Sequence, residues 1–126
     1  MNKKIIITAA VFGMLAIVLG AFGAHALKKN LSIEALSTFE TGVRYQMYHA
    51  LFLLFIGMTN ELSKKTKKLI YNLVVFGVIS FSGSIYLLAI NSLSSFDFKA
   101  IGFITPVGGL LLIMAWGSLL MNLAKK

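Results

Sequence analysis

The sequence predicts an all-α protein, a four-helix transmembrane bundle with both termini in the cytoplasm. Of its 126 residues, 58% are hydrophobic and 13% are charged, whereas a soluble domain is nearer half apolar and a quarter charged. The apolar residues fall into four runs of about 20 residues, the length that crosses a bilayer as a helix. Lysines gather at the ends of these runs. We therefore expect residues 1–126 to form a single integral membrane domain.

The first predicted span covers residues 5–27. Its basic start, its apolar run and the small-x-small pattern Ala24-His25-Ala26 also imitate a secretory signal peptide. The run is longer than the core of a signal peptide, which argues against cleavage. Small residues also recur in it at helical spacings of four and three, an arrangement that lets transmembrane helices pack closely. This stripe consists of Ala9, Gly13, Ala16, Gly20 and Ala24.

The second predicted span covers residues 43–62. An amphipathic stretch precedes it, in which apolar residues recur every four positions from Leu31 to Val43. Ser32 is placed to cap the start of this stretch. We expect one or two helical turns at the membrane interface, leading into the span. The polar segment 61–68 (ELSKKTKK) is predicted to form a tight cytoplasmic loop.

The third predicted span covers residues 69–91 and contains Gly83, one of several small residues suited to close packing. The fourth covers residues 101–123. Its regular helix is expected to begin near Thr105, because threonine as N-cap with proline at the first helical position is a helix-start signal. The pair Gly108-Gly109 is either a close-packing site or a helix N-terminus facing a buried anion. Trp116 is interpreted as a packing residue.

The lysines orient the predicted bundle. Four spans place both termini and the middle loop on the same side of the membrane. That side collects eight lysines: Lys3, Lys4, Lys64, Lys65, Lys67, Lys68, Lys125 and Lys126. The other side has Lys28, Lys29 and Lys99, with Arg44 near that interface. Cytoplasmic loops carry the excess of lysine and arginine, so the net charge of +8 indicates orientation in a membrane rather than binding to nucleic acid.

The segment 39–51 (FETGVRYQMYHAL) interrupts the apolar pattern with an arginine, a histidine, a glutamine and two tyrosines. Ionisable side chains at membrane depth are costly and are therefore candidates for a functional site. Once the helices are oriented, polar residues from all four spans fall in their outer halves. The candidate polar cluster consists of His25, Glu40, Arg44, Tyr45, Gln46, Tyr48, His49, Ser82, Ser84, Tyr86 and Thr105.

Helical spacing pairs some of these side chains. Glu40 and Arg44 are four residues apart in the favourable order, which predicts an ion pair if the helix extends back to residue 40. Alternatively, Arg44 extends to the outer headgroups. Tyr45 and His49 have the same spacing and are able to share a hydrogen bond, and a bond between His25 and His49 would hold the first two spans together.

Three functions stay open at this point. The first is a non-enzymatic membrane protein whose polar cluster is structural or binds a lipid or a partner, either a second copy or another membrane protein. The second is a small transporter or an ion- or proton-coupled carrier that uses His49, Tyr45 and Arg44. The third is an enzyme that acts on a lipid. Two histidines without cysteine make a poor metal site, and nucleotide-binding or hydrolase motifs are absent. We therefore expect no cofactor and no catalytic residues.

Five motifs together resemble domain-of-unknown-function family 423. They are GAFGAHAL at 20–27, TGVRYQMYHAL at 41–51, FSGSIY at 81–86, GFITPVGG at 102–109 and the pair Trp116-Gly117. Members of this family are small multi-pass membrane proteins of bacteria, and animal transmembrane protein 256 looks like a relative. The resemblance implies a four-helix integral protein of the plasma membrane. It brings no activity, substrate or catalytic residue.

Overall fold

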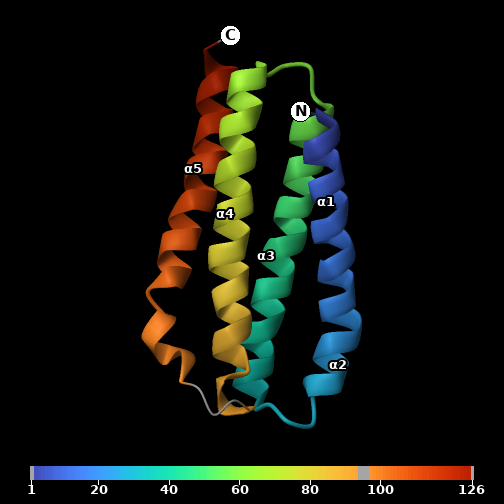
Figure 1. The fold of residues 1–126 in the computed structure, drawn as a ribbon, viewed down its shortest axis with the longest axis vertical. Helices are drawn as coiled ribbons and strands as arrows, with labels where there is room; N and C mark the ends of the chain where they lie inside the picture. Colours follow the sequence, from blue (N-terminus) through green and yellow to red (C-terminus); the bar gives the residue numbers. More distant parts are fainter. Residues whose placement is uncertain (1, 94–96, 126) are drawn as a thin grey trace.

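The computed structural model describes residues 2–93 and 97–125, and all of the elements described are helical (Figure 1). Lys126, one of the lysines that orient the predicted bundle, lies outside these residues. The elements are α1 (Asn2–Ile17), the π-helical turn η1 (Val18–Gly23), α2 (Ala24–Leu27), α3 (Ile33–Met58), α4 (Lys64–Ala89), the 3₁₀ turns η2 (Asn91–Leu93) and η3 (Phe98–Ile101), and α5 (Ile104–Ala124). The structure therefore has the four long helical segments that the sequence predicts.

The first segment contains a feature that the sequence pattern did not reveal, the π-helical turn η1 between α1 and α2. A π turn inserts one extra residue per turn and widens the helix locally. Two glycines in this turn lie against α3. A Cβ atom on Gly20 would lie 3.0 Å from Val43 Cγ1, and one on Gly23 would lie 3.4 Å from the ring of Phe39. Small residues therefore let the widened turn approach the neighbouring helix.

α3 begins where its cap was predicted, because Ser32 Oγ accepts a hydrogen bond of 3.1 Å from the Ala35 N–H. The stretch that follows has the helical turns expected from the sequence, and they run without a break into the predicted span. It forms the first turns of one helix of 26 residues that ends at Met58. Phe39 in this stretch is buried, with its ring centroid 5.2 Å from that of Tyr86. The helix thus begins well before the predicted span at residue 43, and its first turns pack inside the bundle.

The start of α4 and the cap of α5 differ from the predictions, whereas α5 begins at Ile104, next to the predicted Thr105. The Ser63 side chain accepts the Thr66 N–H and caps α4, so the run of lysines expected in a loop instead forms the first turns of this helix. Thr105 does not cap α5, whose N-cap is Phe103 without a side-chain bond. The Thr105 hydroxyl instead shares a hydrogen bond with Ser84 Oγ in α4. The Thr105 hydroxyl thus bonds to the neighbouring helix α4 and does not cap its own helix.

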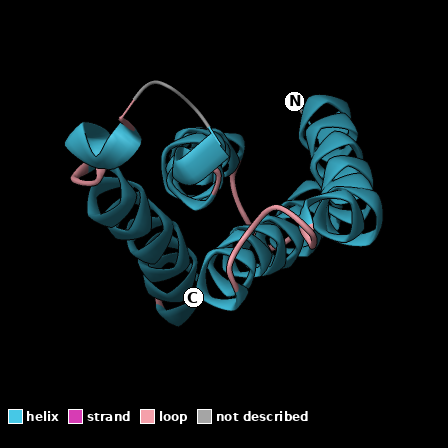
Figure 2. Cartoon of the chain, turned by 90° about the horizontal axis from the view of Figure 1, so that it is seen from below, coloured by secondary structure: helices cyan, strands magenta, loops and turns pink. Residues whose placement is uncertain are grey.

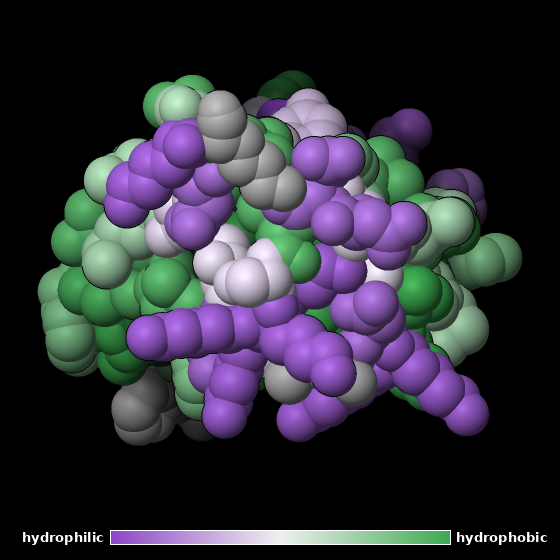
Figure 3. All heavy atoms as spheres, turned by 90° about the horizontal axis from the view of Figure 1, so that it is seen from above, coloured by the Kyte–Doolittle hydropathy of each residue, from purple (hydrophilic) through white to green (hydrophobic). Residues whose placement is uncertain are grey.

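In the bundle, α3 and α4 pack against each other, α1 packs on α3, and α5 packs on α4 (Figures 1 and 2). The apolar core draws on all four helices, with Ile5, Leu53, Ile70 and Leu112 among its buried members. Both termini and the α3–α4 loop lie at one end, which Figure 3 shows covered largely by hydrophilic residues. We call it the lysine-rich end. That this end faces the cytoplasm stays a prediction from the distribution of lysines.

Three helical segments are long and apolar enough to cross a membrane, namely Asn2–Leu27, Lys64–Ala89 and Phe98–Ala124. α3 is as long as α4, at 26 residues, but is not among them. Its middle carries Arg44, Gln46 and His49, which reduce its hydropathy. Because α3 lies between α1 and α4, these neighbours cover part of its polar surface. The bundle therefore accommodates a helix that is too polar to face lipid on all sides.

The glycines predicted to mediate helix packing differ in how closely a neighbouring helix approaches them. In the first stripe, a Cβ atom on Gly13 would lie 3.8 Å from Ala50 Cβ in α3, an ordinary contact. A Cβ atom on Gly108 would lie 2.4 Å from the backbone nitrogen of Phe81, so the backbones of α5 and α4 nearly touch there. Gly109 is looser, 3.6 Å from the Phe81 ring. At Gly83 a Cβ atom would meet no heavy atom within 4 Å, so no other described helix of this chain packs closely there.

Candidate functional site

Gln46 connects three helices through a single carboxamide. The side chain lies on α3 and is 5% exposed. Its Nε2 donates to the carbonyl oxygen of Phe12 in α1 at 2.9 Å, and its Oε1 accepts from the Tyr86 hydroxyl in α4 at 2.7 Å. A buried amide is costly unless both of its ends are hydrogen-bonded. Here both ends have partners, and each partner belongs to a different helix.

Two serines of α4 extend these connections. Ser82 Oγ donates to the carbonyl oxygen of Gly42 in α3 at 2.8 Å. Ser84 Oγ contacts the Phe81 carbonyl oxygen at 3.0 Å and shares a second hydrogen bond with Thr105 Oγ1 in α5. Both serines are buried. α4 is therefore hydrogen-bonded to α3 on one side and to α5 on the other.

The helical spacing suggested a hydrogen bond between His49 and the Tyr45 hydroxyl, but the structure does not contain it. His49 Nδ1 lies 2.7 Å from the Tyr45 carbonyl oxygen, and Trp116 Nε1 donates to His49 Nε2 at 3.1 Å. An indole nitrogen is only a donor, so His49 Nε2 must be the unprotonated acceptor. Nδ1 then carries the proton and donates it to the carbonyl oxygen. This pair of contacts fits the neutral imidazole in one tautomer.

Trp116 has a polar role that the sequence interpretation missed. Its ring stacks on Phe52 with the centroids 4.0 Å apart, as a packing residue would. Its N–H also holds His49, on a helix 67 positions away in the sequence. The available signal was the depth of the only tryptophan in the chain. Tryptophans usually lie at membrane interfaces, and an indole N–H in the middle of a span needs an acceptor.

Several predicted members of the cluster lie outside the interior. His25 is exposed at the end of the first segment, so it forms no pair with His49. Arg44 donates to Thr41 Oγ1 at 3.1 Å, one turn back on its own helix, and the predicted ion pair with Glu40 is not made. Glu40, Tyr45 and Tyr48 are also exposed. Helical spacing therefore identified neither the side chains that bond to each other nor the side that faces the bundle.

The remaining predicted side chains, together with Trp116, form what we call the interior cluster. It consists of Gln46, His49, Ser82, Ser84, Tyr86, Thr105 and Trp116. Trp116 is itself 48% exposed but is hydrogen-bonded to the buried His49. Within the described part of the chain, no buried side-chain nitrogen or oxygen lacks a hydrogen-bond partner. No three histidine, aspartate or glutamate side chains of residues 2–93 and 97–125 lie close enough to share a metal ion. The arrangement is suited to joining helices, because its donors and acceptors are already engaged with each other.

An open groove beside the interior cluster lies between α3 and α5. It has a volume of about 350 Å³. Tyr45, His49 and Trp116 contribute polar atoms to its lining, and the rest of the lining is Phe81, Gly109, Leu112 and Ile113. Pockets for small molecules are typically apolar with a few polar groups. This groove is therefore where an apolar molecule could meet the cluster.

Comparison with known proteins identifies the family to which this sequence belongs. The family model described as "Protein of unknown function (DUF423)" matches residues 19–109. The chain belongs to the DUF423 family. The matched region contains every member of the interior cluster except Trp116. The DUF423 chain matches no solved structure.

Curated relatives of this DUF423 protein are membrane proteins. A UPF0382 membrane protein of Staphylococcus saprophyticus is 42% identical, over 90% of this chain and 91% of the relative. One of Bacillus subtilis is 38% identical over 90% of each chain. The UPF0382 inner membrane protein of Escherichia coli K12 is 34% identical, over 96% of this chain and 89% of the relative. The chain is thus a multi-pass membrane protein of a family whose activity is unknown.

The bond between Trp116 and His49 provides a test of the interior cluster in the DUF423 protein. Trp116→Phe should lower the free energy of unfolding by about 1 kcal/mol, because it removes the donor to His49 but keeps an aromatic ring on Phe52. Unfolding by SDS, followed by circular dichroism, would measure the loss. The same substitution in a His49→Leu background should cost less. An equal cost in both backgrounds would show that the two side chains are not coupled.

Proposed function

We propose that this DUF423 protein is a non-enzymatic integral protein of the plasma membrane that presents a rigid surface to a lipid or to a membrane-protein partner. In this proposal the interior cluster is structural and holds the four helices in register. The observation that carries it is the complete hydrogen bonding of buried side chains in the described residues. Both nitrogens of His49 have hydrogen-bond partners within the protein, which supports a role in joining helices.

The cellular location in this proposal is supported by two observations. The relative in Escherichia coli is described as an inner membrane protein. In addition, most of the described lysines belong to the start of α1, the start of α4 and the end of α5, which lie at one end of the bundle, as expected for a protein with a cytoplasmic end. A partner, whether a second copy of the chain or another membrane protein, would meet the outer surfaces of the helices, where many large apolar side chains are exposed.

A carrier is the second candidate, and the groove between α3 and α5 is the observation that favours it. There Tyr45 and His49 lie beside an open volume of about 350 Å³. A carrier would need water or substrate to reach the interior cluster from one side of the membrane at a time. The structural proposal requires this cluster to stay dry. Access of water therefore distinguishes the two functions.

Single cysteines test the access of water directly, since the chain has no cysteine of its own. We expect Ser82→Cys, Ser84→Cys and Thr105→Cys to resist a membrane-impermeant maleimide, both in intact cells and in inside-out vesicles. All three should react after unfolding in SDS, which shows that the thiols themselves are competent. Labelling of these positions from either side in folded protein would contradict the structural proposal and favour a carrier.

Two exposed positions serve as matched controls for this experiment. His25→Cys lies at the end of the bundle opposite the lysine-rich end and should label in intact cells. Lys65→Cys lies at the lysine-rich end and should label only in inside-out vesicles. The reverse pattern would show that the predicted orientation is inverted, without affecting the conclusion on the interior cluster.

A further inference from the structure

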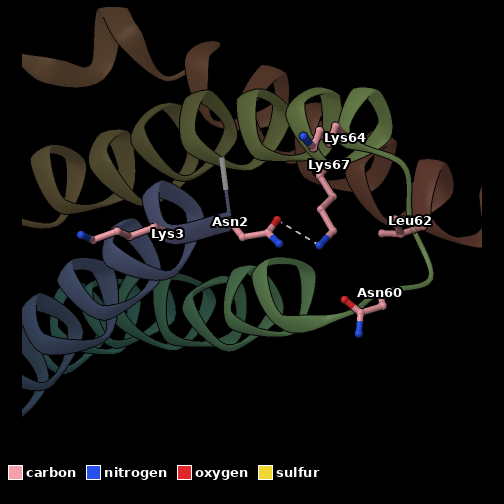
Figure 4. Close-up of a pocket in the computed structure, with 6 residues that line it drawn as sticks. All are labelled: Asn2, Lys3, Asn60, Leu62, Lys64 and Lys67. Atoms are coloured by element: carbon pink, nitrogen blue, oxygen red, sulfur yellow. Dashed lines mark hydrogen bonds between the residues drawn. The ribbon is translucent and has the colours of Figure 1, made fainter.

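Lys67 is a buried lysine in the first turns of α4. Its side chain is 3% exposed, although the sequence places it in a charged loop. Its Nζ donates to Asn2 Oδ1 at 3.0 Å (Figure 4). It also donates to the Thr59 carbonyl oxygen at 2.5 Å. The spacing of Lys67, Ile70 and Val74 is that of one helical face, and all three are buried. This periodicity was the signal that the charge points inward.

The two acceptors of Lys67 are uncharged, one an amide oxygen and the other a backbone carbonyl. They satisfy two of the three N–H donors of an ammonium group and provide no negative charge. A buried charge is costly unless an opposite charge accompanies it. The contacts of Lys67 thus leave one donor and a net positive charge available to a ligand.

Lys67 lines a pocket of about 410 Å³ at the lysine-rich end. Figure 4 shows Lys67 extending toward Asn2, while Lys3 extends away from it along α1. The other lining residues are Asn60, Leu62 and Lys64. α1 and α4 both begin beside the pocket, and helix N-termini favour anions. The pocket thus combines a buried cation, two further lysines and two carboxamides, and none of its lining residues is acidic.

We propose that this pocket binds an anion of the phosphate class, with Lys67 as its buried counter-charge. Lys64 also lines the pocket and adds positive charge, and the amides of Asn2 and Asn60 add neutral donors. A phosphate group suits this set because its several oxygens accept charge-assisted hydrogen bonds from different directions. The phosphate can belong to a lipid headgroup, since the lysine-rich end is one end of the membrane bundle, or to a soluble molecule.

Thermal unfolding of the full chain in neutral detergent tests the proposal, with the fluorescence of Trp116 as the signal. Short-chain phosphatidylglycerol should raise the midpoint by about 4 °C or more. Short-chain diacylglycerol, which lacks phosphate, should not. Inorganic phosphate at constant ionic strength separates the two sources. A rise with both probes indicates phosphate in general, and a rise with the lipid alone indicates a headgroup site. No rise with either probe would overturn the proposal.

Asn2→Asp tests the role of Lys67 without removing it. The new carboxylate would replace the amide whose oxygen now lies 3.0 Å from Nζ, and so would supply the missing charge from within the chain. We expect a higher midpoint without anions and no further rise when they are added. Lys67→Met should also abolish the anion-dependent rise of the midpoint. If Lys67→Met does not fold, the result for Asn2→Asp decides whether Lys67 takes part in anion binding.

The matched control is Lys65→Met, which removes an exposed lysine of the same helix that does not line the pocket. It should keep the full anion-dependent rise. Equal losses in Lys65→Met and Asn2→Asp would indicate general attraction between a basic surface and anions, and would overturn the proposed site. The proposal would also fail if Asn2→Asp kept the rise unchanged.

Discussion

Gly108→Ala is expected to lower the free energy of unfolding by about 3 kcal/mol or to prevent accumulation of the folded protein. The new Cβ atom would lie 2.4 Å from the backbone nitrogen and 2.8 Å from the Cα of Phe81. Because both are backbone atoms, no change of rotamer relieves the clash. α5 would have to move away from α4, which would also disturb the hydrogen bond between Ser84 and Thr105.

Two other glycines provide matched controls for this substitution. Gly83 lies in α4 and Gly117 in α5, and a Cβ atom at either would meet no heavy atom within 4 Å. Gly83→Ala and Gly117→Ala should leave stability unchanged or raise it by up to about 1 kcal/mol, since alanine favours a helix over glycine. SDS titration followed by the fluorescence of Trp116 would measure all three variants. Similar stabilities would show that α4 and α5 are farther apart at Gly108 than the structure places them.

Gln46→Leu is expected to cost about 2 kcal/mol, the second large effect. Leucine has a similar size but removes the donor to the Phe12 carbonyl oxygen and the acceptor of the Tyr86 hydroxyl. Hydrogen bonds between membrane helices average less than 1 kcal/mol, but a buried group left unpaired adds a desolvation cost. The substitution removes two hydrogen bonds, and α1, α3 and α4 are then no longer joined through the side chain at position 46. The same SDS titration gives the value.

A double-mutant cycle separates the hydrogen bond from the change in packing. Tyr86→Phe removes only the hydroxyl that donates to Gln46. The double variant Gln46→Leu with Tyr86→Phe should be more stable than the sum of the two single losses implies, by about 1 kcal/mol, because neither group is then left without a partner. Strict additivity would mean that the two side chains do not interact in the folded protein.

The interior cluster shows how much of the candidate site could be predicted from the sequence. Gln46, His49, Ser82, Ser84 and Tyr86 were predicted from their polarity and depth alone, and the structure brings them into the interior. The same reasoning also selected Arg44 and His25, which are exposed. Polarity at membrane depth identifies the residues that need partners. It does not show which of them reach the interior and which extend to the membrane surface.

The sequence by itself determined that this is a helical membrane protein and where three of its helices start or end to within a few residues. These properties depend on local quantities: the length of an apolar run, its periodicity and caps such as Ser32. Only the tertiary structure decided the partners, because His49 and Trp116, or Lys67 and Asn2, are more than 60 positions apart. Such pairs depend on the rotation and separation of packed helices, which Gly108 sets by contact between two backbones.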